Sequence, residues 1–261
     1  MIVIAENLNT RNKKFMEALK KKDAKAISML SKELADAGAE MINVQCSLDG
    51  SGDAEALPMA IGAIVKTTGL AISLDSRNID ALKKAIPLCS KPPLINFISA
   101  TEPAERRELL SLAADKKAFL IIRASKGIVP TSLESKLQIL EELLEEANAA
   151  DIPNQRLFAD PSIVHIGKGM GQTHLVNSHE CIRALKEMVE PEINTIAWIS
   201  NVSTGMPKAL RPGVNSIFLS YLSGAGLDAA MVDVLDPGIR KTIYMIKSFR
   251  DEVVFSPADL T

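Results

Sequence analysis

Short apolar runs alternate with longer amphipathic segments from one end of the chain to the other. Each run is almost continuously apolar, which is typical of strands that are buried on both faces, as in a parallel sheet. The runs predict eight strands, at Ile2–Glu6, Met41–Gln45, Ala71–Asp75, Leu94–Ile98, Ala118–Arg123, Leu157–Asp160, Thr195–Asn201 and Leu227–Asp233.

The segments between the strands carry apolar residues at the spacing of helices. Leu133–Ala149 is the clearest of them, and Ser132 before it is a residue type that caps helix N-termini. A further helix is expected to begin near Ser178, with His179 in its first turn. Other helical patterns cover Asp23–Ala37, Leu185–Val189, Val214–Ser223 and Gly238–Phe249.

The number of strands favours a closed α/β fold over an open sheet. An open doubly wound sheet usually has about five or six strands, whereas eight strands alternating with helices predict a single (β/α)8, or TIM, barrel. The 261 residues fit the roughly 250 that such a barrel needs. Because no linker, long repeat or low-complexity tract interrupts the pattern, we expect residues 1–261 to form one domain.

Composition and charge exclude several classes of function. The formal net charge of −2 leaves no basic excess for neutralising nucleic-acid phosphates. No apolar stretch approaches the ~20 residues that cross a bilayer, and the start, MIVIAEN, lacks the features of an export signal. Cys46, Cys89 and Cys181 are widely spaced, which fits reduced thiols. We therefore expect a soluble cytoplasmic protein that binds neither nucleic acid nor membrane.

The three histidines raise the question of a metal site, which their spacing does not favour. No two of His165, His174 and His179 lie one helical turn apart, and no Cys or Glu completes a ligand set around them. We expect this chain to bind no metal itself.

Almost every predicted strand ends in a carboxylate or an amide. Asp and Asn also favour loop starts for reasons of turn geometry, but in a (β/α)8 barrel the loops after the strands ring the active site. Asp75, Asn96, Asp160 and Asn201 are embedded in apolar runs, where a carboxylate needs a hydrogen-bond donor. The complete set is Glu6, Asn7, Asn9, Asn43, Gln45, Asp75, Asn96, Arg123, Asp160, Asn201 and Asp233.

These acceptors and amides, with one arginine, suit a heterocycle that carries both donors and acceptors. A pterin presents a guanidine-like pair of N–H donors, which one carboxylate accepts in a bidentate arrangement. The opposite edge of the ring mixes donors and acceptors, and an Asp–Asn pair satisfies it. The same residues would also admit other heterocycles.

Short motifs at these positions resemble the pterin-binding methyltransferases. They are S-L-D-S at 73–76, I-N at 95–96, A-D-P at 159–161 and S-N-V-S at 200–203, in the order and spacing of that family. The segments A-E-N-L-N at 5–9 and G-L-D-A-A-M-V-D at 226–233 are similar as well, so the resemblance covers essentially the whole chain. The nearest branch is that of the methyltetrahydrofolate:corrinoid/iron-sulfur protein methyltransferases.

The resemblance implies a role for each matching residue. Asp75, Asn96 and Asp160 would hydrogen-bond the pterin ring, and Asn201 would reach N5 of methyltetrahydrofolate as the catalytic residue. An amide cannot protonate N5, so Asn201 would stabilise the amine while solvent or another group supplies the proton. Further candidates for the site are Glu6, Asn9, Gln45, Arg123, Lys168 and Asp233.

Lys168 is a candidate for a separate reason. It lies in the glycine-rich loop G-K-G-M-G at 167–171, whose backbone N–H groups could approach a phosphate or a glutamate tail. A loop that is merely flexible would have the same composition.

Two departures from the family pattern bear on the pathway. Where the nearest relatives have D-x-N at the end of the second strand, this chain has Asn43 and Gln45. Where they have I-N-S-T, Asn96 is followed by Phe97 and Ile98. The first change suggests a relative in a different pathway, such as an O-demethylase system, in which the methyl group travels from the corrinoid to tetrahydrofolate.

The resemblance also implies partners. The D-x-H-x-x-G string of corrinoid-binding domains is absent, so a separate corrinoid protein would carry the cobalamin and dock over the barrel mouth. Co(I) would attack the methyl group, and the barrel would position the reactants. Relatives imply a homodimer.

Two other functions stay open. A dihydropteroate synthase shares the barrel and the pterin site, and residues 160–168, D-P-S-I-V-H-I-G-K, are similar to its sixth-strand loop. Against it, the C-terminal segment DEVVFSPADLT lacks the basic and His residues that handle pyrophosphate in that family. A non-catalytic folate-binding subunit would bind methyltetrahydrofolate without turnover.

Overall fold

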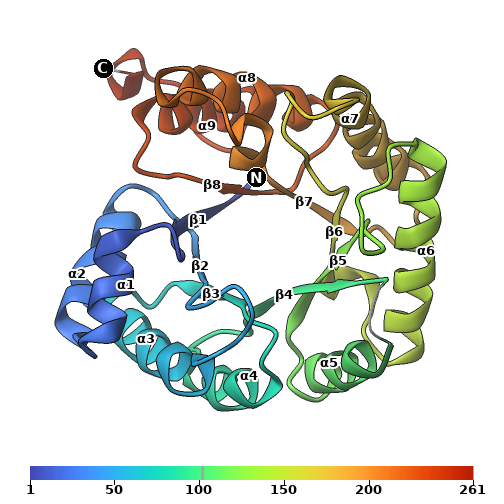
Figure 1. The fold of residues 1–261 in the computed structure, drawn as a ribbon. Coiled ribbons are helices and arrows are strands. Elements are labelled where there is room, and N and C mark those ends of the chain that lie inside the picture. The colour runs from blue at the N-terminus through green and yellow to red at the C-terminus, as the bar shows by residue number, and fades with distance from the viewer. Residues whose placement is uncertain (101–102, 261) are drawn as a thin grey trace.

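Eight parallel strands close into a barrel in the order of the sequence, and β8 pairs with β1 (Figure 1). The structure is a computed structural model that describes residues 1–100 and 103–260. The prediction of a (β/α)8 barrel is confirmed. The strands are β1 (Ile2–Leu8), β2 (Met41–Val44), β3 (Ala71–Asp75), β4 (Leu94–Ser99), β5 (Phe119–Arg123), β6 (Leu157–Asp160), β7 (Asn194–Trp198) and β8 (Ala229–Val232).

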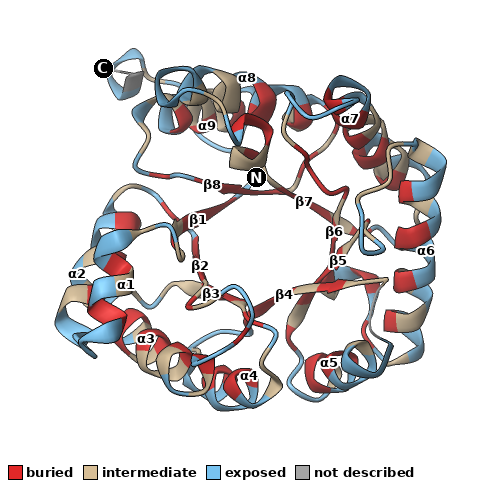
Figure 2. Ribbon diagram, in the orientation of Figure 1, coloured by how far each residue is buried: buried red, intermediate tan, exposed pale blue. Residues whose placement is uncertain are grey.

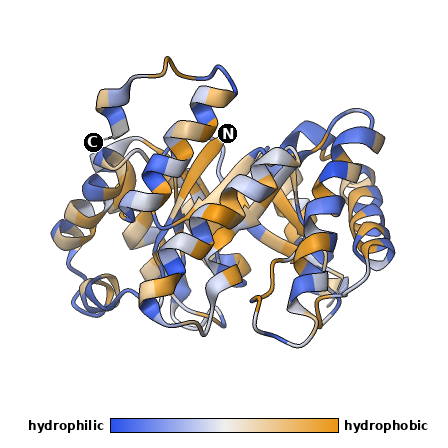
Figure 3. Ribbon diagram, turned by 90° about the horizontal axis from the view of Figure 1, so that it is seen from above, coloured by the Kyte–Doolittle hydropathy of each residue, from blue (hydrophilic) through white to orange (hydrophobic). Residues whose placement is uncertain are grey.

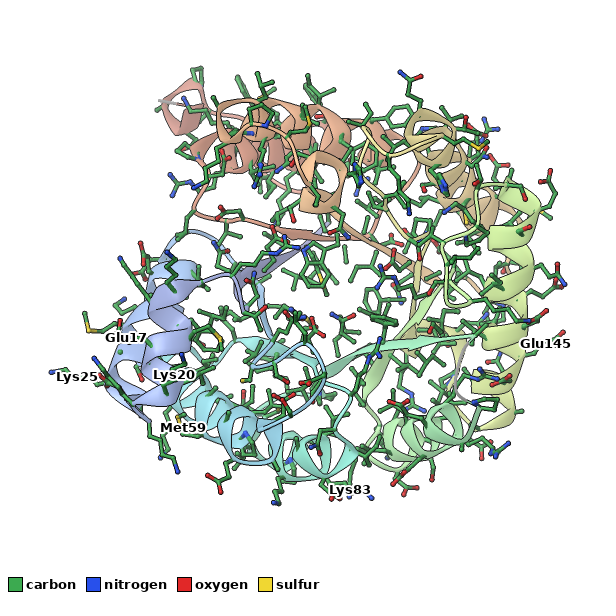
Figure 4. The ribbon with its side chains drawn as sticks, viewed as in Figure 1. Glu17, Lys20, Lys25, Met59, Lys83 and Glu145 are labelled. Carbon is green, nitrogen blue, oxygen red and sulfur yellow. The ribbon has the colours of Figure 1, made fainter. Side chains whose placement is uncertain are left out.

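Helices surround the barrel and cover the outer faces of its strands (Figure 1). Charged side chains such as Lys25, Lys83 and Glu145 point outward from this ring (Figure 4). The helices are α1 (Lys13–Lys20), α2 (Ala24–Asp36), α3 (Asp53–Thr68), α4 (Ile79–Ala85), α5 (Pro103–Asp115), α6 (Leu133–Ala149), α7 (Gly171–Met188), α8 (Arg211–Gly224) and α9 (Pro237–Phe249), with 3-10 turns at Ile86–Leu88, Asn154–Arg156, Ile199–Ser203, Lys208–Leu210 and Pro257–Leu260.

Side-chain caps fix where several helices begin. Asn12, Asp23, Asn78 and Ser132 each accept a hydrogen bond from a backbone N–H in the first turn of α1, α2, α4 and α6. Asp236 does the same for α9, accepting from two N–H groups. Such a cap satisfies a donor that has no partner within the helix.

Two layers of apolar side chains hold the fold together. The larger core lies between the strands and the inner faces of the helices, and burial is concentrated there (Figure 2). A view turned by 90° shows apolar strands between helices whose outer faces are hydrophilic (Figure 3). A separate cluster fills the barrel interior and consists of Ile4, Met41, Leu94, Ile121, Phe158, Ile196, Ala229 and Met231. The barrel is therefore closed below its carboxyl end, as packed TIM barrels are.

Two expected boundaries in the second half of the chain are wrong. One continuous helix, α7, replaces the short helix at Leu185–Val189 and the start expected near Ser178. The Ser178 hydroxyl donates to His174 O at 2.8 Å, one turn earlier, instead of capping a helix. The strand expected at Thr195–Asn201 ends at Trp198, and a 3-10 turn follows it.

Gly171, the first residue of α7, lies where the loop after β6 turns back on itself. A Cβ atom at Gly171 would lie 2.4 Å from Ile166 O and 2.7 Å from His165 O, and both of these atoms belong to the backbone. A Cβ atom at Gly169 in the same loop would meet no atom within 4 Å. The close approach at Gly171 therefore requires glycine, because a backbone cannot give way as a flexible side chain does.

We predict that Gly171→Ala lowers the free energy of unfolding by about 1–3 kcal/mol, the range of an overpacked site. Gly169→Ala is the matched control and should change it by no more than about 0.5 kcal/mol. Urea denaturation of both variants measures the difference. Equal stabilities would contradict the packing assigned to this loop.

Candidate functional site

The barrel interior changes from apolar to polar over one two-residue step along the strands. Side chains two residues apart on a strand point to the same side. The buried cluster residues Ile4 and Leu94 are therefore followed on the same side by Glu6 and Asn96. The same step leads from Met41 to Asn43, from Ile121 to Arg123, from Phe158 to Asp160, from Ile196 to Trp198 and from Met231 to Asp233.

We call this upper layer the polar ring: Glu6, Asn43, Asp75, Asn96, Arg123, Asp160, Trp198 and Asp233. A cavity of about 790 Å³ opens beside it. Six of the residues proposed from the sequence line this cavity: Glu6, Asn9, Gln45, Arg123, Asn201 and Asp233. Its volume falls within the range of about 300–1,000 Å³ that is usual for small-molecule sites.

Asp75 is held by amides from the neighbouring strand. Gln45 Nε2 donates to Asp75 Oδ2 at 2.9 Å, and Asn43 Nδ2 lies 3.4 Å from the same oxygen. Asn43 Oδ1 accepts in turn from Ser73 Oγ at 2.7 Å and from Asn96 Nδ2 at 3.4 Å. Burial raises the pKa of Asp75 to about 6, although the two amide donors oppose the shift. Asp75 and Asn96 thus belong to one network beside the cavity.

Asp160 forms an ion pair with Arg123. Arg123 Nε lies 3.4 Å from Asp160 Oδ2 and also donates to Ser162 Oγ at 3.2 Å. The backbone N–H of Ser162 donates to Asp160 Oδ1 at 2.8 Å. Burial raises the pKa of Asp160, and Arg123 is the strongest influence in the other direction. The Arg123 guanidinium lies over the Phe97 ring, 4.5 Å from its centroid, which fixes its plane at the cavity wall.

A buried lysine supports the turn that carries Asp160. Lys136 projects from α6 with its side chain fully buried, and its Nζ donates to Pro161 O at 2.5 Å and to Ser162 O at 3.3 Å. Burial lowers its pKa to about 8. The sequence contains a signal for this lysine, because Lys136 falls on the buried stripe of α6 that continues at Ile139 and Leu140.

Glu6 is a buried carboxyl group that lines the cavity. Its Oε2 accepts hydrogen bonds from Trp198 Nε1 and from Ser200 Oγ, the latter at 2.8 Å. Burial raises the pKa of Glu6 to about 8; the Ser200 bond and the charge of Arg11 oppose the shift, and the charge of Asp233 adds to it. Glu6 is therefore largely protonated at neutral pH.

Asn201 lies in the 3-10 turn after β7, not on the strand itself. It lines the cavity, and its side-chain amide makes no hydrogen bond with any residue that the structure describes. Its backbone oxygen accepts from Thr204 N at 3.2 Å, which closes the turn. The amide is therefore available to a ligand.

The remaining sequence candidates divide between the cavity and the outer surface. Asn9 Nδ2 donates to Glu6 O at 2.6 Å, and Asp233 Oδ1 accepts from Asn7 Nδ2 at 2.5 Å, so both are fixed at the cavity wall. Lys168 is exposed and does not line the cavity. The glycine-rich loop that carries it lies outside the site.

Several residues of the cavity wall were not proposed from the sequence. Trp198 and Ser200 come from β7 and the turn after it, and Arg11, Lys208 and Arg211 lie at the rim. The rim cations were not proposed because none of them follows directly on a predicted strand: Lys208 and Arg211 begin a 3-10 turn and α8, and Arg11 precedes α1. In the sequence, Trp198 looks like one more apolar residue of its strand. In the structure, its indole N–H donates to the buried carboxyl group of Glu6.

The structure offers no cluster that resembles a metal site. Within residues 1–100 and 103–260, no group of three or more His, Cys, Asp or Glu side chains could hold a metal ion. His174 Nε2 lies 3.0 Å from Thr131 Oγ1, and His179 stacks on Tyr221 with the ring centroids 4.2 Å apart.

Among the described helices, none is both long and apolar enough to span a membrane.

Comparison with known proteins points to one family. The family model for pterin binding enzymes matches residues 5–233. The methylcorrinoid:tetrahydrofolate methyltransferase of Eubacterium limosum is 26% identical over 237 residues, which cover 89% of this chain and 85% of that protein. The methionine synthase of Mycobacterium leprae is 23% identical over 89% of this chain, but this match spans only 20% of its length.

Solved structures with the same architecture include a Yersinia pestis dihydropteroate synthase bound to a pterin–sulfa conjugate. Its TM-score is 0.71, and the match covers 97% of this chain and 94% of that one. At 14% sequence identity this likeness shows the fold alone.

The raised pKa of Glu6 predicts a pH-dependent stability. A carboxyl group whose pKa is higher in the folded state favours folding fully below its ordinary pKa of 4.5, and this contribution is lost as the pH rises toward about 8. Each unit of difference corresponds to about 1.4 kcal/mol. Glu6→Gln keeps an acceptor for Trp198 and Ser200 and cannot ionise. It should match the wild type near pH 4.5 and be more stable by a few kcal/mol at pH 8 to 9.

Urea denaturation across this pH range measures the effect. Glu145→Gln, on the exposed side of α6 (Figure 4), is the control and should show no gain that grows with pH. A Glu6→Gln curve parallel to that of the wild type would mean that Glu6 ionises freely in the folded protein.

Proposed function

This chain belongs to the pterin binding enzyme family, and on that premise we propose that it moves a methyl group between N5 of methyltetrahydrofolate and the cobalt of a corrinoid protein. The observation that carries the proposal is the similarity to the methylcorrinoid:tetrahydrofolate methyltransferase of E. limosum, which extends over 89% of this chain. The family model spans residues 5–233, which include every residue of the polar ring.

The pterin ring would lie against three residues of the polar ring. The Asp160 carboxylate accepts the guanidine-like pair of N–H donors, and Arg123 and the Ser162 N–H stabilise its charge. Asp75 and Asn96, which share the Asn43 network, serve the opposite edge of the pterin. Burial supports this seating, because charge-assisted hydrogen bonds are stronger where water is excluded.

The methyl transfer itself demands little covalent chemistry from the protein. In one direction Co(I) attacks the methyl carbon, the N5–CH3 bond breaks, and N5 keeps the electron pair and takes a proton. The departing amine is a poor leaving group unless N5 gains positive charge or a hydrogen bond. The unpaired amide of Asn201 at the cavity wall is suited to stabilise N5 as this charge develops.

The corrinoid must reach the methyl group from the open side of the cavity. A separate corrinoid protein would dock over the barrel mouth, above the turn that carries Asn201. The benzoyl-glutamate end of the folate carries carboxylates, and the rim cations Arg11, Lys208 and Arg211 suit them.

The physiological direction that we propose runs from the methylcorrinoid to tetrahydrofolate, as in an O-demethylase system. The name of the E. limosum relative, a methylcorrinoid:tetrahydrofolate methyltransferase, supports this direction. A coding gene beside carbon monoxide dehydrogenase components, in place of demethylase components, would count against it. The three free cysteines suit a reducing cytoplasm, and assembly as a homodimer stays a prediction that sedimentation can test.

Dihydropteroate synthase is the second candidate, favoured by the barrel that both share. The methyl-transfer assay below distinguishes the two activities. A dihydropteroate synthase would condense a pterin pyrophosphate with 4-aminobenzoate and would not methylate cobalamin.

The proposal is tested by mixing the protein anaerobically with methyltetrahydrofolate and cob(I)alamin and following the cobalt spectrum. Conversion to methylcobalamin is expected. Binding is followed separately through Trp198, the only tryptophan of the chain, which lines the cavity. If the protein binds methyltetrahydrofolate but transfers its methyl group neither to free nor to protein-bound corrinoid, it is a folate-binding subunit.

Asn201→Ala is expected to slow methyl transfer by about 10²-fold or more while changing the affinity for methyltetrahydrofolate much less. The reason is that the Asn201 contact to N5 strengthens as charge develops there. Single-turnover spectra give the rate, and quenching of Trp198 gives the affinity. Thr204→Ala, on the exposed rim of the same cavity, is the control. A loss of affinity with an unchanged rate would contradict this role.

Asp160→Asn should weaken the binding of methyltetrahydrofolate by about 1.5–3 kcal/mol, the scale of a hydrogen bond to a charged group. An amide can accept only one of the two pterin donors, and it also loses the ion pair with Arg123. Fluorescence titration measures the affinity. An affinity equal to that of the wild type would remove Asp160 from the pterin site.

A further inference from the structure

The proposed methyl transfer leaves one chemical requirement without a residue. Whenever N5 loses or gains its methyl group, a proton must reach it or leave it. Asn201 cannot supply that proton, because a carboxamide is not an acid in the working range of pH. The end of β2, with the residue that follows it, carries two amides, Asn43 and Gln45, and neither of them is an acid. The proton must come from solvent or from another group at the cavity.

Glu6 is a buried carboxyl group at the cavity wall to which the pterin site assigns no role. Its side chain bridges β1 and β7, because its Oε2 accepts from both Trp198 and Ser200. Both donors converge on this one oxygen. Oε1 makes no hydrogen bond within the described part of the chain, and it is not among the side-chain atoms that are sealed from solvent without a partner.

This geometry decides which oxygen carries the proton. Oε2 already accepts two hydrogen bonds, so a neutral Glu6 bears its proton on Oε1, the oxygen that stays accessible. Glu6 lines the cavity with Asn201, and the hydroxyl that binds Glu6 belongs to the neighbouring residue Ser200. The acidic hydrogen and the Asn201 amide therefore border the same space.

The surroundings keep Glu6 able to exchange that proton. Burial and the Asp233 charge beyond β8 favour the neutral acid, whereas the Ser200 hydroxyl and the Arg11 charge favour the carboxylate. On the other side of β1, β2 and the residue that follows it contribute only the neutral amides Asn43 and Gln45. Together these place the pKa of Glu6 at about 8, near the working range of a general acid.

The other carboxyl groups of the polar ring are less suited to this task. Asp75 is occupied by the amides of Gln45 and Asn43, and Asp160 by Arg123 and the Ser162 N–H. Both are assigned to the edges of the pterin. Asp233 is exposed to solvent, and its Oδ1 already accepts a hydrogen bond from Asn7 Nδ2.

We propose that Glu6 is the catalytic acid and base of the methyl transfer, exchanging one proton with N5 of the folate; this rests on the proposed function above. In methyl transfer to cobalt, the Glu6 carboxylic acid gives its proton to N5, Co(I) attacks the methyl carbon, and the N5–CH3 electron pair stays on the amine. In the reverse direction, the lone pair of N5 attacks the methyl carbon and the Co–CH3 electron pair returns to cobalt as Co(I). The Glu6 carboxylate then removes the N5 proton.

The pH dependence of the two directions separates this role from a structural one. With methyltetrahydrofolate and cob(I)alamin the acid form is required, so the rate should be high below the pKa of Glu6 and fall as the pH rises through it. With tetrahydrofolate and methylcobalamin the carboxylate is required, so the rate should rise over the same range. Anaerobic single-turnover spectra between pH 6 and 9 measure both profiles.

Two variants decide the assignment. Glu6→Gln should lose about 10²-fold or more of the rate and the pH limb in both directions, while Trp198 quenching shows that methyltetrahydrofolate still binds. Ser200→Ala removes a donor that favours the carboxylate, so its pH limb should move to higher pH. If Glu6→Gln fails to fold, the shift in Ser200→Ala decides by itself.

A Glu6→Gln enzyme with the wild-type rate and pH limb would overturn the role of Glu6 and leave the methyltransferase proposal intact. An unshifted limb in Ser200→Ala would overturn it in the same way. A wild-type protein that binds methyltetrahydrofolate but transfers no methyl group to any corrinoid would overturn both proposals together.

Discussion

The complete or partial burial of three carboxyl groups at one end of a closed barrel is the constraint on which the rest of the structure depends. Glu6, Asp75 and Asp160 all have raised pKa values because burial disfavours their charged forms. A buried carboxyl group needs hydrogen-bond donors, and each of the three finds donors of a different kind. Their arrangement determines which strands are tied together and which group can carry a proton.

The donors link neighbouring strands at the rim of the barrel. Glu6 joins β1 to β7 through an indole and a hydroxyl, and Asp75 joins β3 to β2 through two amides. Asp160 joins β6 to β5 through Arg123, the cationic partner in the ring. Arg123 therefore opposes the effect of burial at Asp160, whereas the donors to Glu6 are neutral. The carboxyl groups of the polar layer thus differ in the kind of donor that each one meets.

The sequence was sufficient to predict the barrel and most of the ring, because both follow from local periodicity. Glu6, Asn96 and Asp160 stand out in the sequence as polar residues within or at the ends of apolar runs, and no tertiary contact is needed to find them. The segment after β7 could not be predicted in this way. Asn201 continues an apolar run in the sequence, but the chain leaves the sheet after Trp198 and forms a 3-10 turn.

Other features depend on contacts between distant parts of the chain. The start of α7 is set by the loop that turns back onto Ile166 O and His165 O. The sequence does not show this contact, and Ser178 resembles a helix cap although it lies inside α7. The role of Lys136 could not be predicted, because a lysine on the inner face of a helix interrupts the apolar pattern. Its two backbone acceptors are known only from the tertiary structure. The protonation state of Glu6 likewise depends on hydrogen-bond donors almost two hundred residues away in sequence.

A crystal structure of the complex with methyltetrahydrofolate tests the central claim most directly. The account predicts the pterin ring against Asp75, Asn96 and Asp160, with N5 within hydrogen-bond reach of both the Asn201 amide and Glu6 Oε1. A pterin bound outside the polar ring would contradict this prediction. So would a pterin whose N5 points toward Arg123 instead of Glu6.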